Sequence, residues 1–222
     1  MIEKKFIESK KQEFEIKEFI KKKFGKGKIS EVRIERTPVG EKIVITTTRR
    51  GIVIGRAGEN IQGLTTILKR RFKLENPQIE VLEVENPEFD AATIADRIAV
   101  ALERFGQLSF KLIAYRELDR LMKAGALGAE IRLSGRLPSE RAKSHRFAFG
   151  YLKKTGESRF IVNKKLAIAK TKPGVVGVKV SIVPRDTKIP DKIDIDYTKI
   201  KEEIKEEIKK EEKKKNGRNK KK

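Results

Sequence analysis

The sequence contains no cysteine and only one histidine, His145, among its 222 residues. The absence of cysteine excludes disulfides, thiolate metal sites and thiol nucleophiles. A single histidine excludes metal sites built on a histidine pair and argues against a serine–histidine catalytic triad. Most catalytic chemistry is thereby removed, and we expect no metal and no cofactor.

Long apolar runs are also missing. Charged residues make up 39% of the chain, and no apolar run is long enough to span a bilayer. The first eleven residues mix Glu, Lys and Phe without the apolar segment of a secretion signal. We therefore expect a cytoplasmic protein with no membrane span, and the 37% of hydrophobic residues suffices for one or two cored domains.

Positive charge is the dominant feature of the composition, with a formal net charge of +22. Residues 198–222 contain 12 Lys and Arg against six Glu, a net of +6, which leaves +16 on the preceding residues. The body of the chain is thus basic by itself. Such an excess indicates a polyanionic partner, of which nucleic acid is the commonest and an anionic membrane surface the competitor.

Hydrophobic spacing in the first 85 residues predicts a helix, a hairpin, a glycine loop, a second helix and a strand. Pro38 and Gly40 fit the turn of the hairpin. The predicted ranges are a helix over residues 13–24, strands over 31–35 and 41–49, a helix over 61–72 and a strand over 78–84.

Asn86-Pro87 marks a change in the character of the sequence, so we expect a domain boundary at residues 85–89. The second half predicts two helices followed by a mostly antiparallel sheet, which makes the whole chain α+β. The predicted ranges are helices over 90–105 and 108–123 and strands over 129–137, 159–170 and 177–183. The expected organisation is a first domain over 1–85, a second over 86–185, and a charged tail over 186–222 that is a frayed helix and then disordered.

The string G-x-x-G occurs three times, and only its surroundings give it meaning. Gly55-Arg56-Ala57-Gly58 alone precedes an amphipathic helix, carries a cation and follows a short apolar turn, Ile52-Val53-Ile54. This pattern fits a loop whose glycines let the backbone approach an RNA backbone while Arg56 meets a phosphate. The alternative is a tight structural turn with an incidental arginine. The strings at Gly125–Gly128 and Gly174–Gly177 are interpreted as turns.

Four segments carry a resemblance to known families. VIGRAGENIQGL, within the order helix, strand, strand, helix, helix, strand, resembles a type II KH domain. ENPQIEVLEVENPE, AGALGAEIRLSGRL and PGVVGVKVSIVP, in that order, are similar to the family of small-subunit ribosomal protein number three, in its archaeal and eukaryotic branch. The resemblance covers about residues 1–185 and excludes the tail.

The resemblance implies a protein of the small-subunit head that binds ribosomal RNA, contacts neighbouring head proteins and lines the mRNA entry channel, without turnover. In this family a basic pair near the start of the second helix of the C-terminal domain and a basic residue in a Ser-Gly-basic-Leu segment face the mRNA. Here these positions hold Lys111 with Leu112, which departs from the pattern, and Arg136. The expected RNA-binding residues of the KH loop and helix are Gly55, Arg56, Ala57, Gly58, Lys69, Arg70 and Arg71, and the candidates for mRNA or ribosomal RNA are Lys111, Arg116, Arg120, Arg136, Arg141, Lys143 and Arg146.

Other interpretations stay open at this point. Each arginine named for its charge alone has a solvated surface as its alternative. A free KH regulator of RNA processing would carry the same loop. A lyase acting on damaged DNA, an activity claimed for eukaryotic relatives, would need a lysine of depressed pKa, and no constellation around one is recognisable.

Four further expectations concern side chains outside these lists. We expect His145 to be exposed or to face RNA. The alternation of Phe147, Phe149 and Tyr151 favours a half-buried strand over base stacking. The carboxylates of Asp90, Glu103 and Asp119 should form surface ion pairs, and we expect no acid–base site among them.

Overall fold

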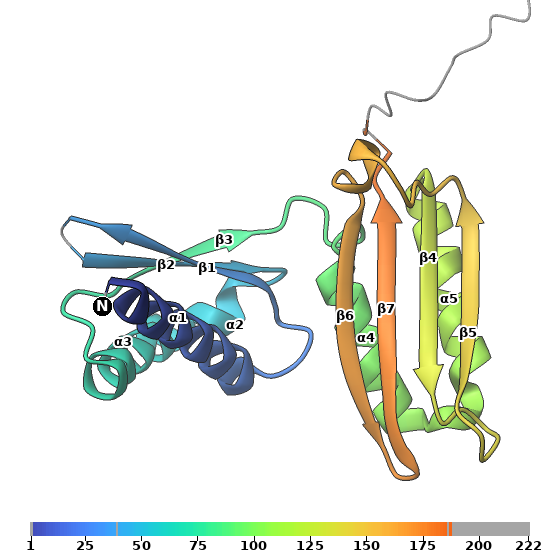
Figure 1. The fold of residues 1–222 in the computed structure, drawn as a ribbon, viewed down its shortest axis with the longest axis horizontal. Coiled ribbons are helices and arrows are strands. Elements are labelled where there is room, and N and C mark those ends of the chain that lie inside the picture. The colour runs from blue at the N-terminus through green and yellow to red at the C-terminus, as the bar shows by residue number, and fades with distance from the viewer. Residues whose placement is uncertain (1, 39, 186, 188–222) are drawn as a thin grey trace, which may run out of the picture. The chain divides into compact units, whose positions relative to one another are not determined.

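A computed structural model describes residues 2–38, 40–185 and 187 (Figure 1). The described chain is α+β, as predicted, with a three-stranded sheet in its first half and a four-stranded sheet in its second. The tail predicted over residues 186–222 lies, apart from Thr187, outside the described residues.

The first half has the order α-β-β-α-α-β that the sequence predicts. β1 pairs antiparallel with β2, and β2 pairs parallel with β3. The parallel pair arises because α2 and α3 carry the chain back before β3 begins. The elements are α1 (Ile2–Phe24), β1 (Ile29–Thr37), β2 (Gly40–Thr47), α2 (Arg50–Ile54), the 3-10 turn η1 (Arg56–Gly58), α3 (Glu59–Phe72) and β3 (Gln78–Glu83).

Apolar side chains of α1, α3 and the sheet form the core of this half. Ile20 of α1, Ile45 of β2 and Leu64 of α3 are fully buried in one cluster. The helix α1 begins at residue 2, so the start predicted at residue 13 is wrong. Residues 2–12 bury almost nothing, and their helical state reflects good helix formers such as Lys and Glu rather than the apolar spacing used for the prediction.

The second half consists of two helices and an antiparallel sheet of strand order β5-β4-β7-β6. The two helices lie on one face of this sheet and leave the other uncovered (Figure 1). The elements are α4 (Ala91–Phe105), the 3-10 turn η2 (Gln107–Ser109), α5 (Phe110–Ala124), β4 (Gly128–Gly135), β5 (Lys143–Gly150), the 3-10 turn η3 (Glu157–Arg159), β6 (Asn163–Thr171) and β7 (Gly174–Val183).

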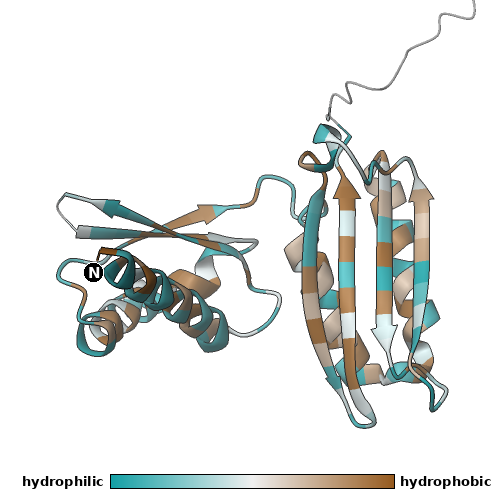
Figure 2. Ribbon diagram, in the orientation of Figure 1, coloured by the Kyte–Doolittle hydropathy of each residue, from teal (hydrophilic) through white to brown (hydrophobic). Residues whose placement is uncertain are grey.

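Alternation of side chains sets the two faces of this sheet. Ile131 of β4 and Val178 of β7 are fully buried against α4 and α5 in the second core. Their neighbours along the strands point to the uncovered face and are mostly polar, so hydropathy alternates along β4 and β7 (Figure 2). We call the uncovered side of the sheet its open face.

Two predicted elements in this half need correction. The strand predicted from residue 159 starts at Asn163, because residues 157–159 form a 3-10 turn first. The Gly174–Gly177 string is not a turn: β7 begins at Gly174 and contains Gly177, and the Thr171 hydroxyl closes the preceding turn on the Gly174 carbonyl at 2.6 Å. The Gly125–Gly128 string spans the connection between α5 and β4, since Gly125 caps α5 and Gly128 is the first residue of β4.

The carboxylates expected to form surface pairs have different roles. Asp90 caps α4, because its side chain accepts hydrogen bonds from the backbone N–H groups of Ala92 and Thr93. Asp119 forms the expected surface pair with Lys123, at 2.7 Å.

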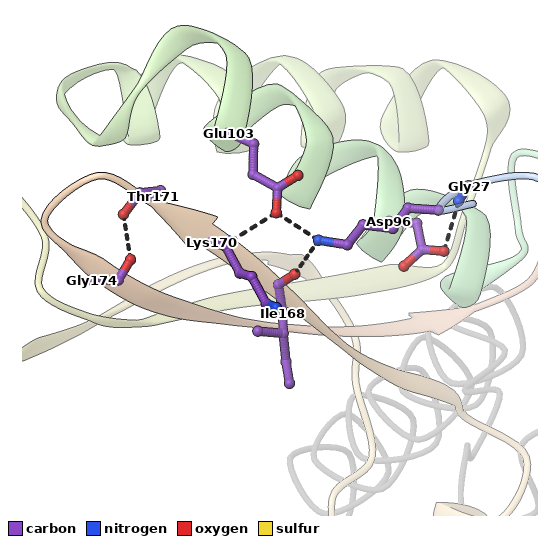
Figure 3. Close-up of polar contacts among 8 residues, drawn as sticks. Gly27, Asp96, Glu103, Ile168, Lys170, Thr171 and Gly174 are labelled. Carbon is purple, nitrogen blue, oxygen red and sulfur yellow. Dashed lines mark hydrogen bonds and ion pairs between the residues drawn. The ribbon is translucent and has the colours of Figure 1, made fainter. Parts of the chain in front are cut away.

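Glu103 of α4 links segments far apart in the sequence (Figure 3). Its Oε1 accepts hydrogen bonds from Lys26 Nζ at 2.5 Å and from the backbone N–H of Lys170 at 2.7 Å. Lys26 also donates to the carbonyl of Ile168 at 2.8 Å. Burial works to raise the pKa of Glu103, but these two hydrogen bonds outweigh it and lower the pKa below its ordinary value.

Candidate nucleic-acid interface

The loop between α2 and α3 has a backbone that few side chains tolerate. Gly55 has φ 75° and ψ −176°, a region that is essentially restricted to glycine. Ala57 at φ 50° and Gly58 at φ 79° are left-handed. Three positive φ angles in four residues bend the chain sharply, so that α3 starts at once at Glu59.

The two glycines of this loop serve different purposes. A Cβ on Gly55 would lie 2.6 Å from Nδ2 of Asn60, whose amide donates to the carbonyl of Ile52 at 3.2 Å. Gly55 therefore lets the loop close on itself. A Cβ on Gly58 would meet no atom within 4 Å, so the space over Gly58 is open to an approaching ligand.

Arg56 and Ala57 project into solvent at the tip of the loop. In the described part of the chain, the guanidinium group of Arg56 has no hydrogen-bond or ion-pair partner. No side chain caps the start of α3, which leaves the N–H groups of its first turn without a side-chain acceptor. A free cation beside uncapped N–H groups suits a phosphate, although Glu59 adds one negative charge to this first turn.

The three basic residues at the end of α3 are not part of this loop. Lys69, Arg70 and Arg71 occupy the last turn of the helix. With a rise of about 1.5 Å per residue, ten or more residues from Glu59 separate them from the loop by about 15 Å or more. The guanidinium carbon Cζ of Arg71 also lies 5.3 Å from the ring centre of Phe19 and 5.5 Å from that of Phe72. These contacts hold the Arg71 side chain against the surface of the protein.

A second group of candidates gathers at one end of the four-stranded sheet. Arg136 and Arg141 lie in the connection between β4 and β5, and Lys143 opens β5. His145, two residues further on, lies 4.8 Å from the ring of Phe110, which directly precedes Lys111. The connection between β4 and β5 and the start of α5 therefore bring Lys111, Arg136, Arg141 and Lys143 to the same end of the domain. All four cations are exposed.

The remaining candidates do not join this group. Arg116 and Arg120 lie further along α5, and Arg120 donates to the buried carboxylate of Glu117 at 2.7 Å. Arg146 points to the open face and pairs with Glu130 at 3.1 Å.

His145 is half-buried against Phe110 of α5, so the expectation that it is exposed is wrong, and the alternative that it faces RNA stays a prediction. Strand alternation puts it on the same side of β5 as Phe147, which is only 7% exposed and lies edge-on to Tyr115. The interpretation of residues 147–151 as a half-buried strand is confirmed for Phe147 and Phe149, while Tyr151 follows the end of β5.

Sequence reasoning missed the cations of the open face, Arg132 and Lys179. The register places Arg132 opposite both Arg146 of β5 and Lys179 of β7. The alternation of Arg132 with the apolar Ile131 and Leu133 does predict that Arg132 points to solvent. The sequence does not show, however, that cations of three different strands lie side by side, because this depends on how the strands are paired.

Two negative findings concern other kinds of site. Within the described ranges, no group of three or more potential ligands could hold a metal ion. No helix in the described part of the chain has the length and apolar character to cross a membrane.

Comparison with known families matches both halves of the chain. Residues 15–89 match the KH domain, and residues 98–182 match the C-terminal domain of ribosomal protein S3. A KH domain followed by this C-terminal domain defines a ribosomal protein.

Individual relatives agree with this class. The chain is 42% identical over 196 residues to small ribosomal subunit protein uS3 of Methanocaldococcus jannaschii, covering 88% of this chain and 93% of that one. The uS3 protein of Methanococcus maripaludis is 39% identical, with 91% and 95% covered. That of Haloarcula marismortui is also 39% identical, and the match spans 87% of this chain but 63% of that longer protein. The chain belongs to the family of small ribosomal subunit protein uS3.

Membership in this family assigns the protein to the structural ribosomal proteins rather than the enzymes. Its place is therefore the cytoplasmic ribosome.

Proposed function

We propose that this protein binds ribosomal RNA in the head of the small subunit and contributes to the lining of the mRNA entry channel. The proposal divides the chain into a KH domain over residues 1–85, a C-terminal domain over 86–185 and a tail over 186–222. The observation that carries it is the loop at Gly55–Gly58, in which an exposed Arg56 without a partner adjoins the uncapped start of α3 and open space over Gly58.

The loop suits a phosphate group better than a base. Its positive φ angles turn the chain into α3, whose first N–H groups and helix dipole favour negative charge. No aromatic side chain lies in the loop on which a base could stack. We therefore assign Arg56 and the backbone between Gly55 and Gly58 to the RNA backbone, and Lys69, Arg70 and Arg71 to a separate contact at the other end of α3.

Lys111 and Arg136 are the residues proposed to face mRNA, with Arg141 and Lys143 beside them. In the described chain, none of these four has an acidic side chain paired with it. Arg116 is exposed on the same helix as Lys111 and stays a candidate. Arg120 and Arg146 are weaker candidates, because their ion pairs with carboxylates reduce the positive charge available to an RNA phosphate.

Sedimentation tests the assembly part of this proposal. A tagged copy of the full chain, expressed in cells and run on a sucrose gradient at physiological salt, should appear in the small-subunit fractions. A free KH regulator of RNA processing would remain at the top of the gradient. Recovery of the protein only in those free fractions would remove the ribosomal assignment.

Arg136→Ala tests the channel part. The variant should enter small subunits normally, because Arg136 is exposed and buries no apolar surface. Its subunits should hold mRNA roughly threefold to tenfold more weakly, since one phosphate contact is lost. The measurement is filter binding of a short mRNA to purified subunits. Arg104→Ala, on the exposed surface of α4, is the matched control, and equal weakening by both variants would contradict a specific role for Arg136.

A further inference from the structure

The open face of the four-stranded sheet carries a row of positive charge. Arg146 of β5, Arg132 of β4 and Lys179 of β7 lie directly opposite one another in the register. All three are exposed and occupy consecutive strands. Since neighbouring strands lie about 4.8 Å apart, this basic row crosses the sheet over about 10 Å.

The basic row has no matching acid within it. Among the outward positions of the four described strands, Glu130 is the only acid, and it is already held by Arg146 at 3.1 Å and by Lys154 at 2.9 Å. Burial works to raise the pKa of Glu130, but the hydrogen bond from Lys154 and the charge of Arg146 outweigh it and lower the pKa. In the described chain, Arg132 and Lys179 form no ion pair.

A hollow beside the basic row concentrates further cations. Its volume is about 190 Å³, and its cationic lining residues are Arg132, Lys153, Lys154, Arg159, Lys164 and Lys179, with Glu130 as the one acid. Partial burial, and then the charges of Arg159 and Lys179, lower the pKa of Lys164. Cations crowded closely enough to disfavour one another's charge create a positive potential that an anion would relieve.

Such an arrangement costs stability in the free protein. Like charges directly opposite on paired strands repel, so the basic row works against the sheet that carries it. Small residues adjoin it, with Ser144, Ser134 and Gly177 forming the next row of the register. The surface next to the basic row therefore carries only short side chains, and the serine hydroxyls can donate hydrogen bonds to phosphate oxygens.

We propose that the open face of the C-terminal sheet binds an RNA sugar–phosphate backbone, with Arg132 and Lys179 as the principal phosphate contacts. This site is separate from the KH loop and rests on the proposed function only in taking RNA as the partner. RNA fits better than an acidic protein segment. The cations are spaced in a line beside short side chains, as a continuous polyanion requires. Among the described strands of this sheet, the large exposed apolar side chains are Leu166, Ile168 and Val175, which lie at one edge, on β6 and the start of β7.

The test removes charge without removing side-chain length. Arg132→Gln with Lys179→Gln in the full chain is compared with Arg104→Gln and Lys123→Gln, which remove the same charge from exposed positions on α4 and α5. The probe is a 20-nucleotide oligouridylate, titrated over a range of salt. We call the double variant Arg132→Gln with Lys179→Gln the open-face pair, and we expect it to lower the affinity for the oligouridylate roughly tenfold. It should also reduce the slope of log K, the binding constant, against log salt by about 1.4, that is, by about 0.7 for each lost phosphate contact. The control pair should change both far less.

Thermal unfolding at low salt separates binding from a structural role. Because two repelling charges are removed, the open-face pair should unfold at the same temperature as the unmodified chain or higher. A lower unfolding temperature would mean that the two residues support the sheet, and equal loss of RNA affinity in the control pair would mean that only net charge matters. Either result overturns the proposal, as does polyglutamate competing as well as RNA of equal charge.

The same titration in an Ala57→Asp background distinguishes this site from the KH loop. If the loop proposal fails, Ala57→Asp alone leaves affinity unchanged and the open-face pair still weakens binding. If the open-face proposal fails, Ala57→Asp weakens binding and the open-face pair adds nothing beyond its control.

Discussion

Ala57→Asp should weaken the binding of single-stranded RNA to the full chain by roughly tenfold to a hundredfold. A carboxylate at the tip of the loop would stand near the phosphate assigned to Arg56, and two like charges about 4 Å apart repel by about 1 kcal/mol in water and about 4 kcal/mol near a protein surface. The fold should be unaffected, because Ala57 is exposed and its left-handed backbone, at φ 50°, is one that Asp adopts more readily than Ala.

Ala57→Asn is the matched control for this prediction. Asn has the shape of Asp and the same tolerance of the left-handed region, but it carries no charge. Fluorescence anisotropy with a labelled oligouridylate should therefore give an affinity near that of the unmodified chain for Asn and a much lower one for Asp. If both variants bind equally well, no phosphate lies at this loop.

Gly128→Ala should destabilise the chain by about 3 kcal/mol or more, the largest stability change that we expect from a single methyl group. A Cβ at Gly128 would overlap the carbonyl oxygen of Tyr151 and lie 2.7 Å from its nitrogen. These are backbone atoms, fixed by the hydrogen bond from Tyr151 N–H to the Leu127 carbonyl at 3.0 Å. The added methyl group can be accommodated only if β4 and β5 separate at this end.

Thermal unfolding measures this effect, and about 3 kcal/mol corresponds to a fall of about 6–12 °C for a chain of this size. Gly177→Ala in the neighbouring strand is the control, since its Cβ would meet its nearest atom, the Ser134 carbonyl oxygen, at an ordinary 3.7 Å. Equal unfolding temperatures for the two variants would show that the β4–β5 end is more pliable than its hydrogen bonds indicate.

The sequence predicted the elements of the fold well where apolar spacing reports burial. The hairpin of β1 and β2, the helices α3, α4 and α5 and the strand β3 all lie within a few residues of their predicted ranges. The errors fall where burial is weak. The first turns of α1 bury no core residue, and the stretch before β6 is a 3-10 turn with exposed apolar side chains such as Phe160. Periodicity carries no information about such segments.

The candidate site was predictable only in part, for a related reason. The glycine loop is local, and its four residues together with the following helix are enough to locate it. The basic row requires knowing that residues 132, 146 and 179 are paired across three strands, which no local pattern contains. His145 was misjudged because its polar neighbours in sequence, Ser144 and Arg146, point to the opposite face of the strand.

The contacts of Lys26 also set an order of events during synthesis. Its acceptors, Glu103 and the Ile168 carbonyl, lie 77 and 142 residues further along the chain. At elongation rates of about 5–20 residues per second, roughly 7–28 s pass between the synthesis of Lys26 and that of Ile168. The nascent first half therefore completes its own core well before this lysine finds its second acceptor, and the link to β6 is a late step that only a nearly finished polypeptide can make.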